Sequence, residues 1–120
     1  MTQIFSPPDE SEFFERGFGL SAMHTPDECV ISFVRSYADG NELTLTFEVG
    51  SITTLHVSLE RLSKVLTEIT AESVADVSFQ SWHGERTIRC GFSLHSVAMD
   101  LRIHYDPAAS IHFSALSKYD

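Results

Sequence analysis

The sequence predicts an α+β fold: an antiparallel β-meander sheet of about six to seven strands with one main helix and a short N-terminal helix. Segments that alternate apolar and polar residues outnumber helical segments, and they are rich in β-branched and aromatic side chains. One longer helical pattern falls mid-chain, at about residues 59–72. With 120 residues, 42% of them hydrophobic, residues 1–120 are expected to form a single globular domain.

The first expected element is a short helix at about residues 7–16, within the stretch SPPDESEFFERGFG. Ser6 is a suitable N-cap and Gly17 a favourable stop. About ten residues make a helix that is marginal alone, so Phe13 and Phe14 are expected to dock it on the core. The alternative is a free arm that binds a partner.

Two alternating segments, 29–37 and 42–49, flank the pair Asp39-Gly40, which favours a hairpin. A two-residue turn there would pair Val34 with Leu45 and send both inward. The second face of the first strand would then also be apolar, and a helix or a partner would have to cover it. That face would carry Ile31, Phe33 and Tyr37.

A third strand is expected at 52–57, and the main helix follows it at about 59–72 with Ser58 as its cap. Glu60 and Lys64 form a favourable i,i+4 pair on that helix. The apolar stripe is made by Leu59, Leu62, Val65, Leu66 and Ile69. We expect this stripe to pack on the sheet.

The C-terminal third is expected to form a meander of strands at 74–82, 87–94, 96–105 and 111–116. Keeping apolar residues on one face pairs Leu94 with Val97, Gly91 with Asp100, Arg89 with Arg102, and His104 with His112. The other face would then carry Arg89, Asp100, Arg102, His104 and His112. Such a patch is either a solvated sheet face or the site of a small hydrolase or ligand-binding domain, where paired histidines and arginines could cleave a phosphodiester.

Motifs of common catalytic and metal sites are missing from the sequence. It has no glycine-rich phosphate loop, no G-x-S-x-G, no H-E-x-x-H and no C-x-x-C. His104 and His112 would supply two metal ligands, whereas zinc usually takes at least three from protein. We therefore expect no enzyme activity, no metal and no cofactor.

The net charge of −9 is concentrated near the N-terminus, where residues 1–48 hold nine acidic and two basic residues. An acidic surface repels nucleic acid and anionic membranes, so neither is expected as a partner, and it attracts a basic protein. No apolar run is long enough for a membrane span, and the N-terminus lacks a secretory signal. With Cys29 and Cys90 expected as free thiols buried in strands, a cytoplasmic location follows.

The acidic run DESEFFE and the acids expected to be exposed nearby give the chain its overall type. In size, acidity and lack of a catalytic motif, it resembles the immunity proteins of bacterial toxin–immunity pairs. The resemblance implies an inhibitor that binds and neutralises a basic toxin domain, often a nuclease, through its acidic surface, with aromatic residues at the interface centre. The expected partner-binding residues are Asp9, Glu10, Glu12, Glu15, Asp27, Glu28, Glu42, Glu48 and Trp82. A self-associating structural subunit, such as a homodimer, is a further alternative.

Overall fold

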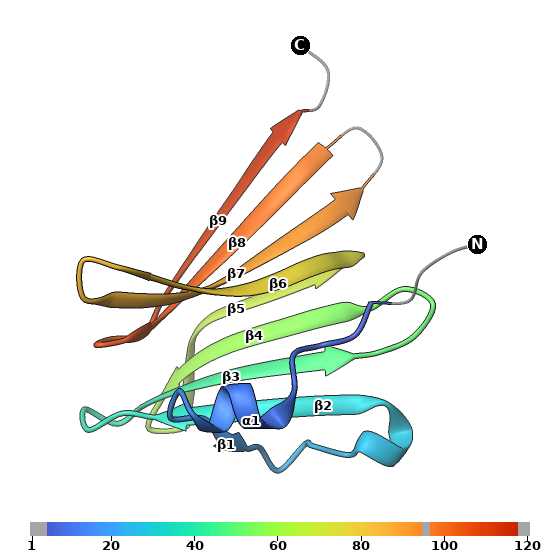
Figure 1. Cartoon of the computed structure of the whole chain (residues 1–120). Helices are drawn as coiled ribbons and strands as arrows, with labels where there is room; N and C mark the ends of the chain where they lie inside the picture. The colour runs from blue at the N-terminus through green and yellow to red at the C-terminus, as the bar shows by residue number, and fades with distance from the viewer. Residues whose placement is uncertain (1–4, 95–96, 118–120) are drawn as a thin grey trace.

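The computed structural model describes residues 5–94 and 97–117, which form two antiparallel sheets (Figure 1). Sheet A contains β1 (Gly19–Leu20), β2 (Val30–Ser36), β3 (Asn41–Glu48), β4 (Thr54–Arg61) and β5 (Lys64–Glu72) in that order. Sheet B contains β6 (Val74–Trp82), β7 (Glu85–Leu94), β8 (Val97–Asp106) and β9 (Ser110–Ser117). The described helices are short: α1 (Glu10–Phe14) and the 3₁₀ turn η1 (Pro26–Glu28). The predicted α+β class is therefore wrong, because the described chain is mostly β, with nine strands instead of six to seven.

The main helix predicted at 59–72 is a β-hairpin. β4 continues to Arg61, and the chain turns at Leu62 and Ser63, which have φ values of 51° and 67°. Positive φ at both central residues is the requirement of a type I′ hairpin turn, which usually contains Asn or Gly. Because this turn uses neither, nothing in the local sequence interrupted the helical pattern. The leucines of residues 59–72 therefore lie on two paired strands and their turn, although their spacing along the sequence matches one face of a helix.

The predicted register between β2 and β3 is wrong by one residue. Val34 pairs with Thr44, and Phe33 pairs with Leu45, because residues 37–40 form a longer turn than the expected pair. The Asp39 carboxylate accepts a hydrogen bond from the Asn41 N–H at 3.0 Å and fixes this turn. Phe33 therefore points into the core and is fully buried. The apolar second face that motivated self-association is absent from β2, whose outward positions are Val30, Ser32, Val34 and Ser36.

One peptide unit joins the two sheets. The Val74 N–H donates at 3.1 Å to Thr53 O, immediately before β4 of sheet A, and Ser73 O accepts from the Ser93 N–H in sheet B at 3.0 Å. Ser73 has φ 65°, so the chain bends between β5 and β6. From this joint the two sheets diverge, as Figure 1 shows, and their inner faces enclose the core.

The distal ends of the sheets are tied together by polar contacts. Arg35 at the end of β2 forms an ion pair with Asp106 of β8, with Nη2 and Oδ1 at 3.2 Å. The Tyr37 hydroxyl donates to Tyr105 O at 2.7 Å, and burial raises the pKa of Tyr37 to about 12. These contacts fix the angle between two sheets that share only one covalent connection.

Helix α1 fills the gap between the inner faces. It has five residues, fewer than the ten predicted, and Phe13 is fully buried, as expected. The Phe13 ring stacks on Phe33 of β2 at 3.9 Å and meets Phe79 of β6 edge-on at 5.2 Å. Phe14 is 45% exposed and meets Phe33 only edge-on at 6.5 Å, so Phe13 is the main ring that docks the helix. The helix therefore belongs to the core and is not a free arm.

In sheet B, the predicted faces are confirmed. Leu94 pairs with Val97, and Arg89 with Arg102, as expected; the turn predicted at residues 95–96 lies outside the described residues. Between β8 and β9 the pairing differs by two residues, so His104 pairs with Ser110. A two-residue shift leaves Ile111 and His112 on their predicted faces.

The two cysteines differ in their surroundings. Cys90 of β7 is fully buried, and burial raises the pKa of its thiol to about 12. Cys29 is exposed at the end of η1, with φ 62°, so its predicted burial in a strand is wrong. Both are free thiols.

Candidate functional site

The outer face of sheet A, which points away from the core, carries carboxylates on three adjacent strands. The ladders place Glu42 opposite Glu60, align Glu48 with Thr54 and Glu72, and set Glu68 opposite Ser58. Within β2–β5, all of which the structure describes, no Lys or Arg alternates onto this face. We call Glu42, Glu48, Glu60, Glu68 and Glu72 the acidic sheet face.

Few contacts within the chain neutralise this face. The Glu48 carboxylate lies 3.2 Å from His56 Nε2, and Glu42 accepts a hydrogen bond from the Ser36 hydroxyl at 3.3 Å. Glu42 and Glu60 lie directly opposite each other, and like charges in that position are destabilising. The stability of the free protein therefore does not explain the acidic sheet face.

Asp27 and Glu28 extend the acidity at one end of sheet A. Both are exposed in η1, which immediately precedes β2. Val30, at the start of β2, pairs with Glu48, and so η1 lies near the same end of the sheet. Of the predicted binding residues, Asp27, Glu28 and Glu48 thus lie near one end of sheet A, whereas Glu42 lies at the other end of β3, opposite Ser36.

The remaining predicted acids lie on the other side of sheet A. Asp9, Glu10, Glu12 and Glu15 are exposed on and beside α1, whose Phe13 packs on the core face of the sheet. Glu10 Oε1 lies 3.3 Å from Nε2 of the largely buried His24. Because His24 Nδ1 accepts a hydrogen bond from the Ser32 N–H at 3.0 Å, a neutral His24 holds its proton on Nε2, toward Glu10. This contact anchors α1 to the edge of sheet A.

Trp82 is separated from both acidic groups. It ends β6 in sheet B and is 75% exposed, with its ring 4.5 Å from the His83 ring. It lines a hollow of about 630 Å³ on the outer face of sheet B, together with Gln80, Glu85, Thr87, Arg102 and His104. Large exposed aromatic residues of this kind often anchor protein interfaces.

The outer face of sheet B contains the residues of the predicted hydrolase or ligand site. Arg89 Nε and Arg102 Nε donate to the two oxygens of Asp100 at 2.6 and 3.0 Å. Burial alone would raise the pKa of Asp100, but these hydrogen bonds and positive charges lower it overall. A carboxylate held ionised is unsuited to general acid–base work near neutral pH, and its two arginines are already engaged.

The His104 and His112 rings lie 5.0 Å apart, and His104 Nδ1 contacts the Thr87 hydroxyl at 3.2 Å.

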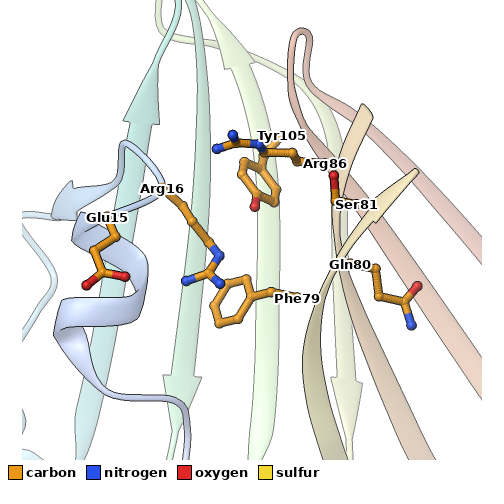
Figure 2. A pocket seen from close by; sticks show the side chains of 7 residues that line it. All are labelled: Glu15, Arg16, Phe79, Gln80, Ser81, Arg86 and Tyr105. Atoms are coloured by element: carbon orange, nitrogen blue, oxygen red, sulfur yellow. The ribbon is translucent and has the colours of Figure 1, made fainter. Parts of the chain in front are cut away.

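A separate cavity of about 370 Å³ opens between α1 and sheet B (Figure 2). In Figure 2, Arg16 extends from the end of α1 over the Phe79 ring, and its guanidinium carbon lies 3.9 Å from the ring centroid. Arg86, on the opposite wall, reaches Asp106 at 3.7 Å. Both cations that line the cavity are thus committed to contacts that join elements of the fold.

In the described residues, no three side chains of His, Cys, Asp or Glu gather closely enough to hold a metal ion. The same residues contain no helix with the length and apolar character that a membrane crossing requires.

Sequence reasoning missed three members of the acidic sheet face: Glu60, Glu68 and Glu72. They belong to the hairpin that was interpreted as a helix. The signal that could have revealed them is the strict alternation of Leu55, Val57 and Leu59, which predicts that Glu60 continues the outward row of a strand.

Comparison with known proteins relates the fold to toxin–immunity systems. No protein-family model matches the chain, and no curated protein matches its sequence. Among solved structures, a chain of the contact-dependent growth inhibition toxin–immunity protein complex from Klebsiella pneumoniae 342 superimposes with a TM-score of 0.71 at 18% identity. The match covers 91% of this chain and 95% of that chain. The two chains share a fold, and the resemblance to toxin–immunity proteins expected from the sequence is confirmed at that level.

Proposed function

We propose that this protein is an immunity-type inhibitor that binds a toxin domain and neutralises it, without enzymatic activity of its own. The observation that carries the proposal is the fold shared, over nearly the full length of both chains, with a chain of a toxin–immunity complex. The net charge of −9 and the acidic sheet face favour a basic toxin domain. The cytoplasm is the compartment in which we expect the two proteins to meet.

The chemistry of such an inhibitor follows from charge. A nuclease binds phosphate groups through Lys and Arg side chains. Carboxylates on a rigid sheet can form ion pairs with those side chains in place of the phosphates. Long-range attraction between oppositely charged surfaces also speeds association. We therefore expect a nuclease domain as the target.

Within this proposal, the predicted binding residues have unequal roles. Asp27, Glu28, Glu42 and Glu48 lie near or on the acidic sheet face and are assigned to direct contact. Asp9, Glu10, Glu12 and Glu15 lie beyond the sheet on α1 and are assigned to long-range attraction. Trp82 remains an interface candidate on sheet B, which would require a partner that reaches around the molecule.

Co-expression tests the function. The reading frame immediately upstream is to be examined first: a large secreted protein with a basic C-terminal domain encoded there would be the candidate toxin. That domain would be produced in Escherichia coli with and without this chain. We expect the domain alone to stop growth and the wild-type chain to restore it. A double reversal, Glu42→Lys with Glu48→Lys, should weaken protection, whereas Trp82→Ala should have a smaller effect. Continued growth arrest with well-expressed wild-type chain would contradict the proposal.

A further inference from the structure

The tip of the β4–β5 hairpin exposes three large apolar side chains within five consecutive residues. Leu62 is 83% exposed, Leu66 is 51% exposed and Val65 is 48% exposed. Single apolar residues on a surface need no explanation, but a cluster on one hairpin commonly marks an interaction site. Leu66 is also the extra residue at a β-bulge, where the register with Leu59 and Glu60 shifts.

The backbone beside this cluster has a free edge. β5 has nine residues, all of which except Leu66 pair with β4, and no strand of the described chain pairs with its other edge. At Ser73 the chain bends away, so β7 pairs with β6 and not with β5. An edge of this length offers N–H and C=O groups to which an extended segment can add as a further strand.

Charge decides which segment fits. Glu60 lies opposite Val65 on the outer face, and Glu68 lies opposite Ser58, so carboxylates flank the apolar cluster on that face. The exposed cations of the tip, Arg61 and Lys64, pair with each other on the inner face. A second copy of this chain is a poor occupant, because antiparallel self-pairing centred on β5 would bring two Glu68 carboxylates together. Lys64, opposite Arg61 on the inner face, would not neutralise Glu72, which lies opposite Thr54 on the outer face. A segment that carries Lys or Arg beside apolar residues complements this surface.

We propose that the β4–β5 docking surface, made of Glu60, Leu62, Val65, Leu66, Glu68 and the free edge of β5, binds an extended basic segment of the toxin domain by strand addition. The inference rests on the proposed function and names where and how the partner binds. The apolar side chains form the dry centre of the interface, and the carboxylates lie at its rim. Backbone pairing holds the segment in register.

Affinity measurements with matched variants test the surface. The upstream-encoded toxin domain, inactivated by mutation, would be titrated with each purified variant by calorimetry. We expect Glu68→Lys to raise Kd at least about tenfold and Leu66→Ser combined with Glu68→Lys about a hundredfold. The controls are Glu85→Lys on β7, an equal change in charge on a side chain that is 62% exposed, and Leu20→Ser on β1, where the leucine is 48% exposed. Both controls should stay within about threefold of wild type.

Hydrogen exchange provides a second readout that does not depend on substitutions. Amides of residues 64–72 should gain protection in the complex, whereas those of β1 should not. Unchanged affinity of the double variant with unprotected β5 amides would overturn the docking surface while leaving the proposed function intact. Concentration-dependent dimerisation that protects the same amides without the toxin domain would assign this edge to a second copy. Absence of binding by the wild-type chain would instead reject the proposed function.

Discussion

The outer faces of the two sheets differ in whether their charged side chains have partners within the chain. On sheet B, one carboxylate, Asp100, accepts hydrogen bonds from both Arg89 and Arg102, so these charged groups have partners within the chain. On sheet A, Glu42 stands opposite Glu60, and no Lys or Arg occupies the outer face of its strands β2–β5. Charges on sheet B are therefore accounted for by the fold, whereas those on sheet A are available to another molecule.

The two sheets should unfold as one unit, and a substitution of Phe13 is the strongest test of this expectation. Its ring contacts Phe33 of sheet A and Phe79 of sheet B. Phe13→Ala should lower the free energy of unfolding by about 3–5 kcal/mol, because it leaves a cavity between the sheets. Urea denaturation followed by fluorescence measures this. Phe14→Ala, on the exposed neighbouring ring, is the control and should cost less than about 1 kcal/mol. Two separate transitions in the wild-type protein would contradict a shared core.

The contacts of Asp100 with two arginines on sheet B should contribute measurably to stability. Asp100→Asn leaves Arg89 and Arg102 facing each other, and we expect a loss of about 1–2 kcal/mol at pH 7. Because the folded protein lowers the pKa of Asp100, its ionised form stabilises the fold above the unfolded pKa. That contribution disappears as the pH falls through the lowered pKa.

The difference between wild type and Asp100→Asn should therefore shrink in acid. Urea denaturation at pH 7 and at about pH 3 provides the measurement, since an unperturbed Asp titrates at about 3.9. A difference that is equal at both pH values would show that Asp100 acts through packing and not through its charge.

The smallest expected effect has the opposite sign and belongs to sheet A. Glu42→Gln removes one of two facing like charges and should raise the free energy of unfolding by about 0.2–1 kcal/mol. The same substitution should weaken binding to the toxin domain. A variant that gains stability and loses affinity would show that the acidic sheet face is kept for recognition. Lower stability in Glu42→Gln would mean that this carboxylate serves the fold, through Ser36.

Much of the fold was predictable where alternation was uninterrupted. In sheet B, the pattern from Ile88 to Ile103 placed the faces correctly, because a buried face tolerates no one-residue slip. The β4–β5 hairpin was missed because Leu62 and Ser63 turn the chain without a turn-forming residue, so the leucines retained a helical period. Pairing with β4, a tertiary interaction, decided the structure of that segment.

The candidate site was predictable only where the alternation of a strand was uninterrupted. Glu42 and Glu48 follow from the alternation of β3, but Glu60 and Glu68 could not join them without the correct hairpin. The separation of the α1 acids from the sheet was also beyond the sequence pattern. It depends on Phe13 stacking on Phe33, and that contact required the register of β2 and β3 to be known.

Strict alternation along β3 and β4 has a consequence for how such a protein can change over generations. Leu43, Leu45 and Phe47 are fully buried, while the residues between them face outward. Alternate residues of the same strand therefore serve folding and recognition. The exposed outward residues, such as Glu42 and Glu48, could change to meet a new partner without disturbing the core, whereas Thr46 is buried and hydrogen-bonded to Ser32.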